Sequence, residues 1–153
     1  MPGSHKYAVS GSWVKGSGGI LRSDVFAPTV TFSSPPEFGG EPGLWTPEYL
    51  LLAAVAGCFV STFAAIAAFS KFGFDSLDIV VHGEIQKVDG GWRFTTIEVQ
   101  PTLTVAAAAN GERAVALLAK AEAACLVSRS LSSKVTMTPT VRKATADPTA
   151  TPS

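Results

Sequence analysis

The chain has 153 residues, a length that suits one folded domain with short tails. Twelve basic residues balance twelve acidic residues and only 16% of residues are charged, so the chain lacks the basic surface that nucleic-acid binding requires. Because 46% of residues are hydrophobic and 22 are alanine, we expect another subunit to cover part of the surface, as in a homodimer.

The ends of the chain differ in composition from its middle. We expect a flexible N-terminus over residues 1–5, a folded domain over 6–142, and a disordered tail of mainly Ala, Thr and Pro over 143–153. The N-terminal residues do not show the charged and apolar segments of a secretory signal. We therefore expect a cytoplasmic protein whose thiols are reduced.

The first part of the domain is predicted to hold strands over residues 6–14, 20–23 and 29–32. Between the first two, Gly16-Ser17-Gly18-Gly19 predicts a turn and does not match the phosphate-binding pattern GxGxxG. Residues 33–46, rich in Pro and Gly, predict a long loop of the kind that often carries a site.

A long apolar helix is predicted to follow this loop. Thr46 suits the N-cap, Pro47 the first helical position and Glu48 the first turn, and Gly73 is expected to end the helix in a left-handed conformation. The helix is long enough to cross a membrane. Seven of the twenty residues 50–69 are alanine and the flanks are not strongly basic, which favours a helix buried in protein and no membrane partner.

A helix that is apolar on every side must be surrounded by protein. Ala53, Ala54 and Gly57 are small residues at helical neighbour spacings, which lets another helix approach closely. We therefore expect Cys58 in or beside a helix–helix contact across a dimer axis.

The second half of the domain is predicted to begin with a hairpin of strands 77–88 and 92–105, bent or broken at Pro101. A helix over residues 112–124 and a last strand over 135–141 follow. The order of strands, helix, hairpin, helix and strand predicts an α+β fold and not a doubly wound parallel sheet.

The candidate chemistry centres on the two cysteines, Cys58 and Cys125, each of which could instead be a small buried hydrophobic residue. They are too few for a disulfide scaffold, and His5 and His82 give no support to a metal site or a Cys–His pair. Arg129, one turn after Cys125, could favour a thiolate, but such a residue is more often a solvated surface charge.

Glu48 is the candidate carboxylate, although it could serve only the helix dipole. It precedes Cys58 by ten residues, about 15 Å along a helix, which is too far for contact within one helix. The two residues would therefore act together only across a dimer interface.

Three features occur together: the pair Pro47-Glu48, Cys58 ten residues after that Glu, and Cys125 in the setting C-x-V-S-x-x-L. This combination, over residues 35–67 and 121–131, resembles the OsmC/Ohr family of thiol-dependent organic hydroperoxide reductases. The order of elements agrees over residues 6–142. The resemblance implies an OsmC-like α+β fold, with antiparallel sheets around a long buried central helix in an intertwined homodimer.

The resemblance also implies roles for individual residues. Cys58 would be the peroxidatic thiol, Cys125 the resolving thiol, and Glu48 would help to position the cation that activates Cys58. The family has an arginine where this chain has Lys15, and the nearest arginine is Arg22. A lysine cannot make the planar, bidentate contact of a guanidinium, so activation of the thiolate is the point at which this sequence departs from the family.

The activity that the resemblance implies is the reduction of alkyl or lipid hydroperoxides to alcohols during oxidative stress, through a sulfenic acid and an intramolecular disulfide. Phe59, Phe63 and Trp45 are expected to screen the thiolate and to favour apolar peroxides. The reductant would be an external dithiol of the dihydrolipoyl type or a lipoylated protein, with no bound cofactor or metal. The alternative is a stress protein of the same fold, with little or no catalysis, that binds an apolar ligand or partner.

Overall fold

The computed structural model describes residues 3–145, which form an α+β structure. The chain divides into two compact units, residues 1–51 and residues 52–153. The α+β class predicted from the order of elements is confirmed.

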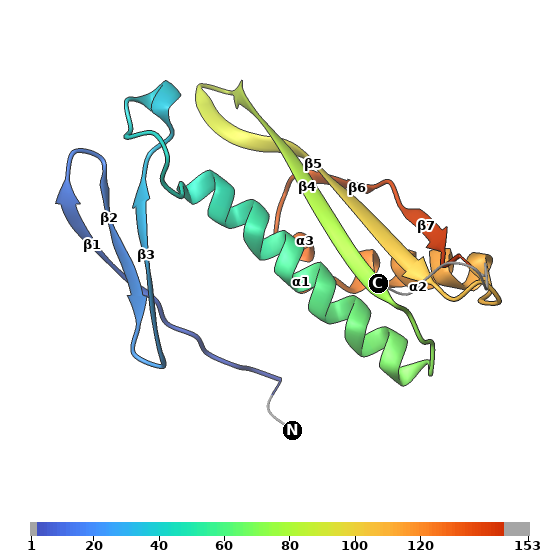
Figure 1. Ribbon diagram of the computed structural model, residues 1–153. Helices are drawn as coiled ribbons and strands as arrows, with labels where there is room; N and C mark the ends of the chain where they lie inside the picture. Colours follow the sequence, from blue (N-terminus) through green and yellow to red (C-terminus); the bar gives the residue numbers. More distant parts are fainter. Residues whose placement is uncertain (1–2, 146–153) are drawn as a thin grey trace. The chain divides into compact units, whose positions relative to one another are not determined.

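The first unit contains a three-stranded antiparallel sheet in the order β1-β2-β3 (Figure 1). Its strands are β1 (Ser10–Lys15), β2 (Gly18–Ser23) and β3 (Phe26–Ser33), followed by a 3₁₀ turn at Pro36–Phe38. The turn between β1 and β2 needs a left-handed residue, and Gly16 supplies it with φ 55°. The first strand begins later than predicted, because residues 6–9 have no strand partner in the described chain.

Helix α1 (Pro47–Phe69) begins where the sequence predicts. The Thr46 hydroxyl accepts a hydrogen bond from the backbone N–H of Tyr49 at 3.1 Å, which satisfies one of the free donors of the first turn. The predicted N-cap is therefore confirmed, and Glu48 lies in the first turn.

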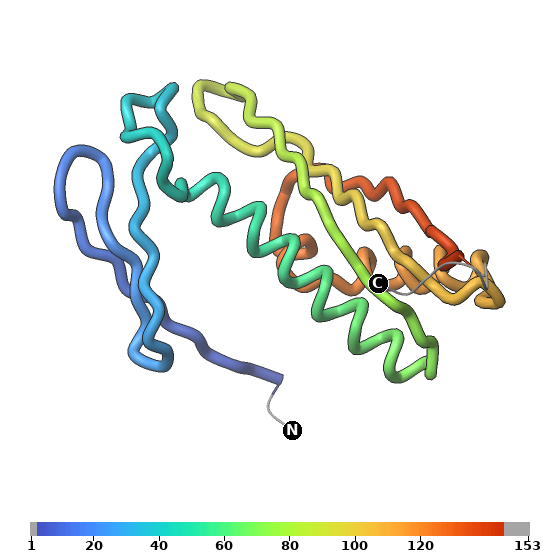
Figure 2. The backbone as a smooth tube through the Cα atoms, viewed as in Figure 1, coloured from blue at the N-terminus to red at the C-terminus, as the bar shows by residue number. Residues whose placement is uncertain are grey.

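The end of α1 differs from the prediction, because Lys71 with φ 53°, and not Gly73, is the left-handed residue. The N–H of Phe72 bonds the carbonyl of Ala67 at 2.8 Å, and the N–H of Lys71 bonds that of Ala68 at 3.1 Å. These two bonds form a Schellman motif, and the burial of Phe72 in the core accompanies it. Figure 2 shows the chain turning from this end of α1 towards the next strand.

The second unit contains a long hairpin of β4 (Ser76–Val88) and β5 (Gly91–Val105), with β6 (Lys134–Met137) and β7 (Thr140–Lys143) both parallel to β5. The predicted last strand is thus two short strands, and the antiparallel sheet gains a parallel edge. The sequence predicts a bend or a break at Pro101, and the structure excludes the break, because β5 continues through this residue. Pro101 lies between the segments that pair with β6 (residues 96–99) and β7 (residues 102–105), so its missing N–H costs no ladder bond on that side.

Helices α1 and α2 (Gly111–Ala124) contribute to one hydrophobic core with β5. The buried stripe of α1 recurs every four residues, and alternate residues of β5 from Ile97 to Val105 are buried against it. The stripe on α1 consists of Val55, Phe59, Phe63 and Ala67.

Leu52 and Ile66, beside this stripe, are partly buried against the core, and the opposite side of α1 is exposed, so within the single chain only one side of this helix is buried. Among residues 3–145, α1 is the one helix long and apolar enough to cross a membrane, with a mean hydropathy of 2.3, and 22% of its most apolar window is buried.

The C-terminal boundary also differs from the prediction. Lys143 belongs to β7, and the N–H of Ala144 bonds the carbonyl of Val105 at 2.7 Å, so the sheet continues past residue 142. The predicted tail and N-terminus fall partly on residues 146–153 and 1–2, which lie outside the described residues.

Candidate active site

Cys58 lies in the fourth turn of α1 and is partly exposed. Its sulfur is 3.9 Å from the Thr62 hydroxyl oxygen, one helical turn later. This contact follows from helix geometry, because residues four apart lie one above the other on the same face.

Cys125 lies between α2 and α3 (Leu126–Arg129), with the extended backbone angles φ −63° and ψ 112°. Figure 1 shows α3 beside the middle of α1, where Cys58 is located. Cys125 is only 1% exposed, and both cysteines are reduced thiols. The Ser128 hydroxyl donates a hydrogen bond to the Cys125 sulfur at 3.4 Å.

The Cys58 thiol has a lowered pKa. Burial by itself would raise the pKa, but hydrogen bonds from the backbone N–H of Val127, the Cys125 thiol, the Thr62 hydroxyl and the backbone N–H of Leu126 outweigh that effect. The thiolate of Cys58 is therefore present at lower pH than that of an ordinary cysteine, and the thiolate is the nucleophilic form.

The pKa of Cys125 moves in the opposite direction. Burial raises it, Ser128 offsets part of that rise, and the neighbouring Cys58 raises it further. Arg129 is exposed and is not among the described groups that shift the pKa of Cys125, which agrees with a solvated surface charge and not with stabilisation of a thiolate.

The two thiols thus form a coupled pair in which the pKa of Cys58 is lowered and that of Cys125 is raised, so Cys58 loses its proton more readily and the Cys125 thiol is the hydrogen-bond donor. Such a pair can attack an electrophile with one sulfur and keep the second sulfur in reserve for a disulfide. Cys58 and Cys125 are 67 positions apart in the sequence, and they were expected to lie near each other. The position of α3 beside α1 brings them together.

Replacing Thr62 by valine is expected to move the pH–rate profile of Cys58 to higher pH. Valine has the shape of threonine but donates no hydrogen bond, so the pKa of Cys58 rises towards its ordinary value. At a pH below that pKa, we expect alkylation of Cys58 by iodoacetamide to slow by about 2- to 10-fold, as one weak hydrogen bond predicts. The Cys125→Ser background confines the reagent to Cys58, and an unchanged profile would show that the Thr62 hydroxyl does not act on the thiolate.

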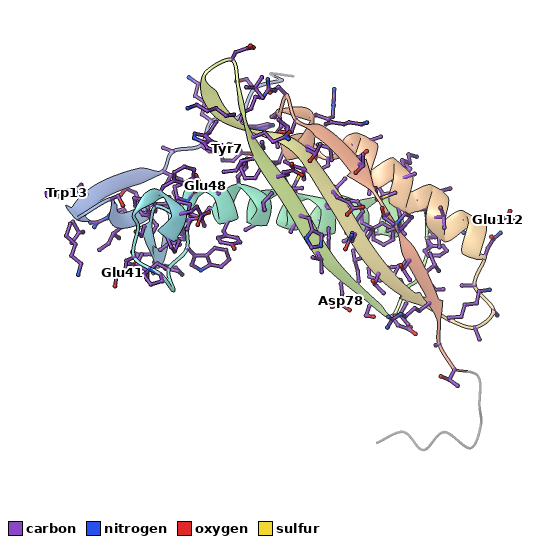
Figure 3. All side chains as sticks on the ribbon, turned by 90° about the horizontal axis from the view of Figure 1, so that it is seen from above. Tyr7, Trp13, Glu41, Glu48, Asp78 and Glu112 are labelled. Atoms are coloured by element: carbon purple, nitrogen blue, oxygen red, sulfur yellow. The ribbon has the colours of Figure 1, made fainter. Side chains whose placement is uncertain are left out.

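Glu48 and Lys15 lie in the first unit, whereas both cysteines lie in the second. Figure 3 labels Glu48 in the first turn of α1 and Glu41 in the loop before that helix. Glu48 is half-buried, and its Oε1 is enclosed with no hydrogen-bond partner among residues 3–145. A buried carboxylate oxygen without a donor is energetically costly.

Lys15 ends β1 and lines a pocket of about 380 Å³ within the first unit. The pocket is enclosed by the β1–β2 turn, the end of β3 and the loop at residues 39–44. Arg22, the other candidate cation, lies on the exposed part of β2 and does not line this pocket. Of the two cations, Lys15 is therefore the one beside a cavity.

The aromatic side chains expected to screen the thiolate are placed differently. Phe59 and Phe63 are 1% and 0% exposed and belong to the core, on a different face of α1 from Cys58. Trp45 belongs to the first unit. Phe69, which is 89% exposed, lies on the Cys58 side of α1 but eleven residues later, about 16 Å along the helix axis.

No group of three potential metal-binding side chains from His, Cys, Asp and Glu occurs within the described part of the chain.

Residues 40–140 match the sequence profile of the OsmC-like protein family, a segment that contains Glu48 and both cysteines. The chain belongs to the OsmC-like protein family. Lys15 lies outside the matched segment. A search of curated proteins finds no match to the chain.

Solved structures of OsmC-like proteins share this fold. An OsmC-like protein of unknown function from Vibrio cholerae is 15% identical with a TM-score of 0.80, covering 89% of this chain and 99% of its own. An organic hydroperoxide resistance protein from Elizabethkingia anophelis is 20% identical with a TM-score of 0.75, covering 94% and 100%. A third, named an organic hydroperoxide resistance protein OsmC, from Legionella pneumophila, is 22% identical with a TM-score of 0.72, covering 91% and 99%.

Two residues that contact the thiols of this OsmC-like protein, Thr62 and Ser128, were not predicted from the sequence. Their signals were present, since Thr62 follows Cys58 by one helical turn and Ser128 follows Cys125 by three residues. A hydroxyl at such a spacing is too common in sequences to indicate a sulfur contact without the backbone geometry.

Proposed function

We propose that this OsmC-like protein is a thiol-dependent peroxidase that reduces organic hydroperoxides to alcohols. The observation that carries the proposal is the hydrogen-bonded pair of thiols, in which the pKa of the accessible Cys58 is lowered and that of the buried Cys125 is raised. Perturbed pKa values of this kind are typical of redox-active cysteines.

In the proposed cycle, the Cys58 thiolate attacks one oxygen of the hydroperoxide and the O–O bond breaks. The oxygen bonded to sulfur gives the Cys58 sulfenic acid, and the other oxygen takes up a proton and leaves as the alcohol. The Cys125 sulfur then displaces the hydroxyl group as water and forms the Cys58–Cys125 disulfide. An external dithiol, which we propose is of the dihydrolipoyl type, reduces this disulfide and becomes a disulfide itself.

The proposed substrate class is alkyl or lipid hydroperoxide. On the second unit, the exposed side chain of Leu126 lies next to Cys125 in the chain. Apolar surface of this kind suits an apolar substrate better than hydrogen peroxide.

We also propose a homodimer in which the exposed face of α1 packs against a second copy. In this arrangement Glu48 faces Cys58 of the second copy, and Lys15 supplies the cation. The exposed face of this apolar helix supports an additional molecule at α1.

A charge on the exposed face of α1 is expected to separate the proposed dimer. Ala64 is exposed and lies outside the buried stripe, so Ala64→Asp costs little in the single chain but buries a carboxylate in a dimer. We expect light scattering after gel filtration to show a monomer for this variant and a dimer for the wild type. Ala119→Asp, which places the same charge on an exposed position of α2, should remain dimeric. A wild-type protein that is monomeric and fully active would contradict the proposal.

The activity is tested by mixing the reduced protein with cumene hydroperoxide or hydrogen peroxide in a stopped-flow instrument. We expect faster oxidation by the organic peroxide, with one disulfide formed per molecule of peroxide consumed. Oxidation no faster than that of free cysteine would instead favour the binding protein of little activity, the outcome expected if Lys15 cannot replace the family arginine.

A further inference from the structure

Ser128 is a buried residue whose hydroxyl is directed at a sulfur atom. It is the third residue of α3, is 7% exposed, and donates a hydrogen bond to the Cys125 sulfur at 3.4 Å. Cys125 itself is 1% exposed, so little water can reach this sulfur. The hydroxyl of Ser128 is therefore a protein group placed to solvate Cys125.

A neighbouring serine shows that this direction is not forced by the helix. The hydroxyl of Ser130, at the end of α3, donates to the backbone carbonyl of Leu126 four residues earlier, at 2.9 Å. That is the usual local bond of a helical serine. Ser128 donates instead to a side chain that the proposed cycle uses.

The chemistry of the resolving step creates a need for such a donor. A thiol attacks as its thiolate, and a buried thiolate without hydrogen bonds is unfavourable. Before oxidation, the Cys125 thiol donates to the Cys58 thiolate and carries no charge. Once Cys58 holds an oxygen, Cys125 must lose its proton in a site that water hardly enters.

We infer that Ser128 is a positioning residue for disulfide formation, whose hydroxyl orients the Cys125 sulfur and stabilises the negative charge on it as it attacks the Cys58 sulfenic acid. This inference rests on the proposed function. In the step, the Cys125 thiolate forms the S–S bond as the S–O bond of Cys58 breaks. The departing hydroxide and the proton released by Cys125 together leave as water.

The ionisation of Cys125 is consistent with this role. Burial raises its pKa, and Ser128 is the residue that counteracts the rise. Removing the hydroxyl should therefore raise the pKa of Cys125 further. The effect is confined to the resolving step, because Ser128 is not among the groups that shift the pKa of Cys58.

The test follows one turnover of Ser128→Ala with one equivalent of cumene hydroperoxide. A 1,3-diketone traps the sulfenic acid of Cys58 in competition with disulfide formation, and mass spectrometry measures both products across a range of pH. We expect sulfenic acid to form at the wild-type rate and the disulfide to form about tenfold or more slowly near neutral pH. The deficit should shrink as the pH rises and Cys125 ionises without help.

Two variants separate this role from a packing role. Ser128→Thr keeps the hydroxyl and should restore most of the rate of disulfide formation. Ser130→Ala removes the hydroxyl that bonds a carbonyl and should behave as the wild type. The inference is wrong if Ser128→Ala closes the disulfide at the wild-type rate, or if its deficit is the same at every pH.

A second measurement distinguishes failure of this inference from failure of the proposed function. In a Cys58→Ser background, the ultraviolet absorbance of the thiolate reports the pKa of Cys125 without any peroxide. We expect Ser128→Ala to raise that pKa relative to the background. If peroxide does not oxidise Cys58 in the wild type, the proposed peroxidase fails, and this titration alone shows whether Ser128 stabilises the Cys125 thiolate.

Discussion

Replacing Cys58 by serine is expected to abolish the reduction of cumene hydroperoxide. A serine hydroxyl remains protonated near neutral pH and is a much weaker nucleophile than a thiolate, so the first step of the proposed cycle is lost. We expect the second-order rate constant for peroxide consumption to fall at least about a thousandfold, as loss of a nucleophile does in other enzymes. Stopped-flow mixing of equal protein concentrations with excess peroxide measures this constant directly.

The comparison is informative because serine differs from cysteine by one atom and Cys58 is only partly buried. Circular dichroism and thermal unfolding should show an intact fold in the variant. If the Cys58→Ser variant and the wild type consume the peroxide equally slowly, Cys58 is not a peroxidatic thiol. The protein is then a binding member of its family, with the thiol pair serving another purpose.

The start of α1 could be predicted from the sequence because its signals are local. A threonine followed by Pro47 places an N-cap and a first helical residue side by side, and both are determined by backbone geometry within one turn. The end of α1 could not be predicted in the same way. Glycine is the usual left-handed residue, but here the burial of Phe72 holds Lys71 in that conformation, which is a tertiary effect.

The strand through Pro101 is a second feature that could not be predicted from the local sequence. Proline in a strand predicts a bend or an edge when only the local sequence is known. The structure accommodates Pro101 because two separate strands, β6 and β7, pair with β5 on either side of it. Those strands lie more than thirty residues further along the chain, so their pairing is beyond local pattern.

The candidate site was also only partly predictable from the sequence. The sequence resemblance identified both cysteines, and the structure places them within hydrogen-bonding reach. The resemblance did not indicate which groups determine the ionisation of the two thiols. Arg129, which the sequence left open as either a thiolate partner or a surface charge, is not among the groups that shift either pKa, whereas backbone N–H groups of α3 and two hydroxyl side chains are. Every residue except proline carries a backbone N–H, so the sequence does not show which of these groups donates to a sulfur, and only the fold does.

Replacing Cys125 by serine is expected to stop the proposed cycle after its first chemical step. The serine hydroxyl can still donate a hydrogen bond to the Cys58 thiolate, so peroxide attack should proceed at nearly the wild-type rate. The sulfenic acid then has no neighbouring thiol to attack it. With one equivalent of cumene hydroperoxide, mass spectrometry should show one added oxygen in this variant and a disulfide in the wild type.

Excess peroxide makes the effect larger, because a sulfenic acid that is not resolved is oxidised onward to the irreversible sulfinic acid. We expect the Cys125→Ser variant to be inactivated within a few turnovers, whereas the wild type survives in the presence of a dithiol. Cys125→Ala separates the two contributions of this residue, since it removes both the resolving sulfur and the hydrogen bond to Cys58. In the alanine variant, the pKa of Cys58 should be higher than in the wild type. At a pH below that pKa, less thiolate is present and peroxide attack should be slower. If both variants retained the peroxide resistance of the wild type, Cys125 would have no part in resolution, and its burial against α3 would be explained by packing alone.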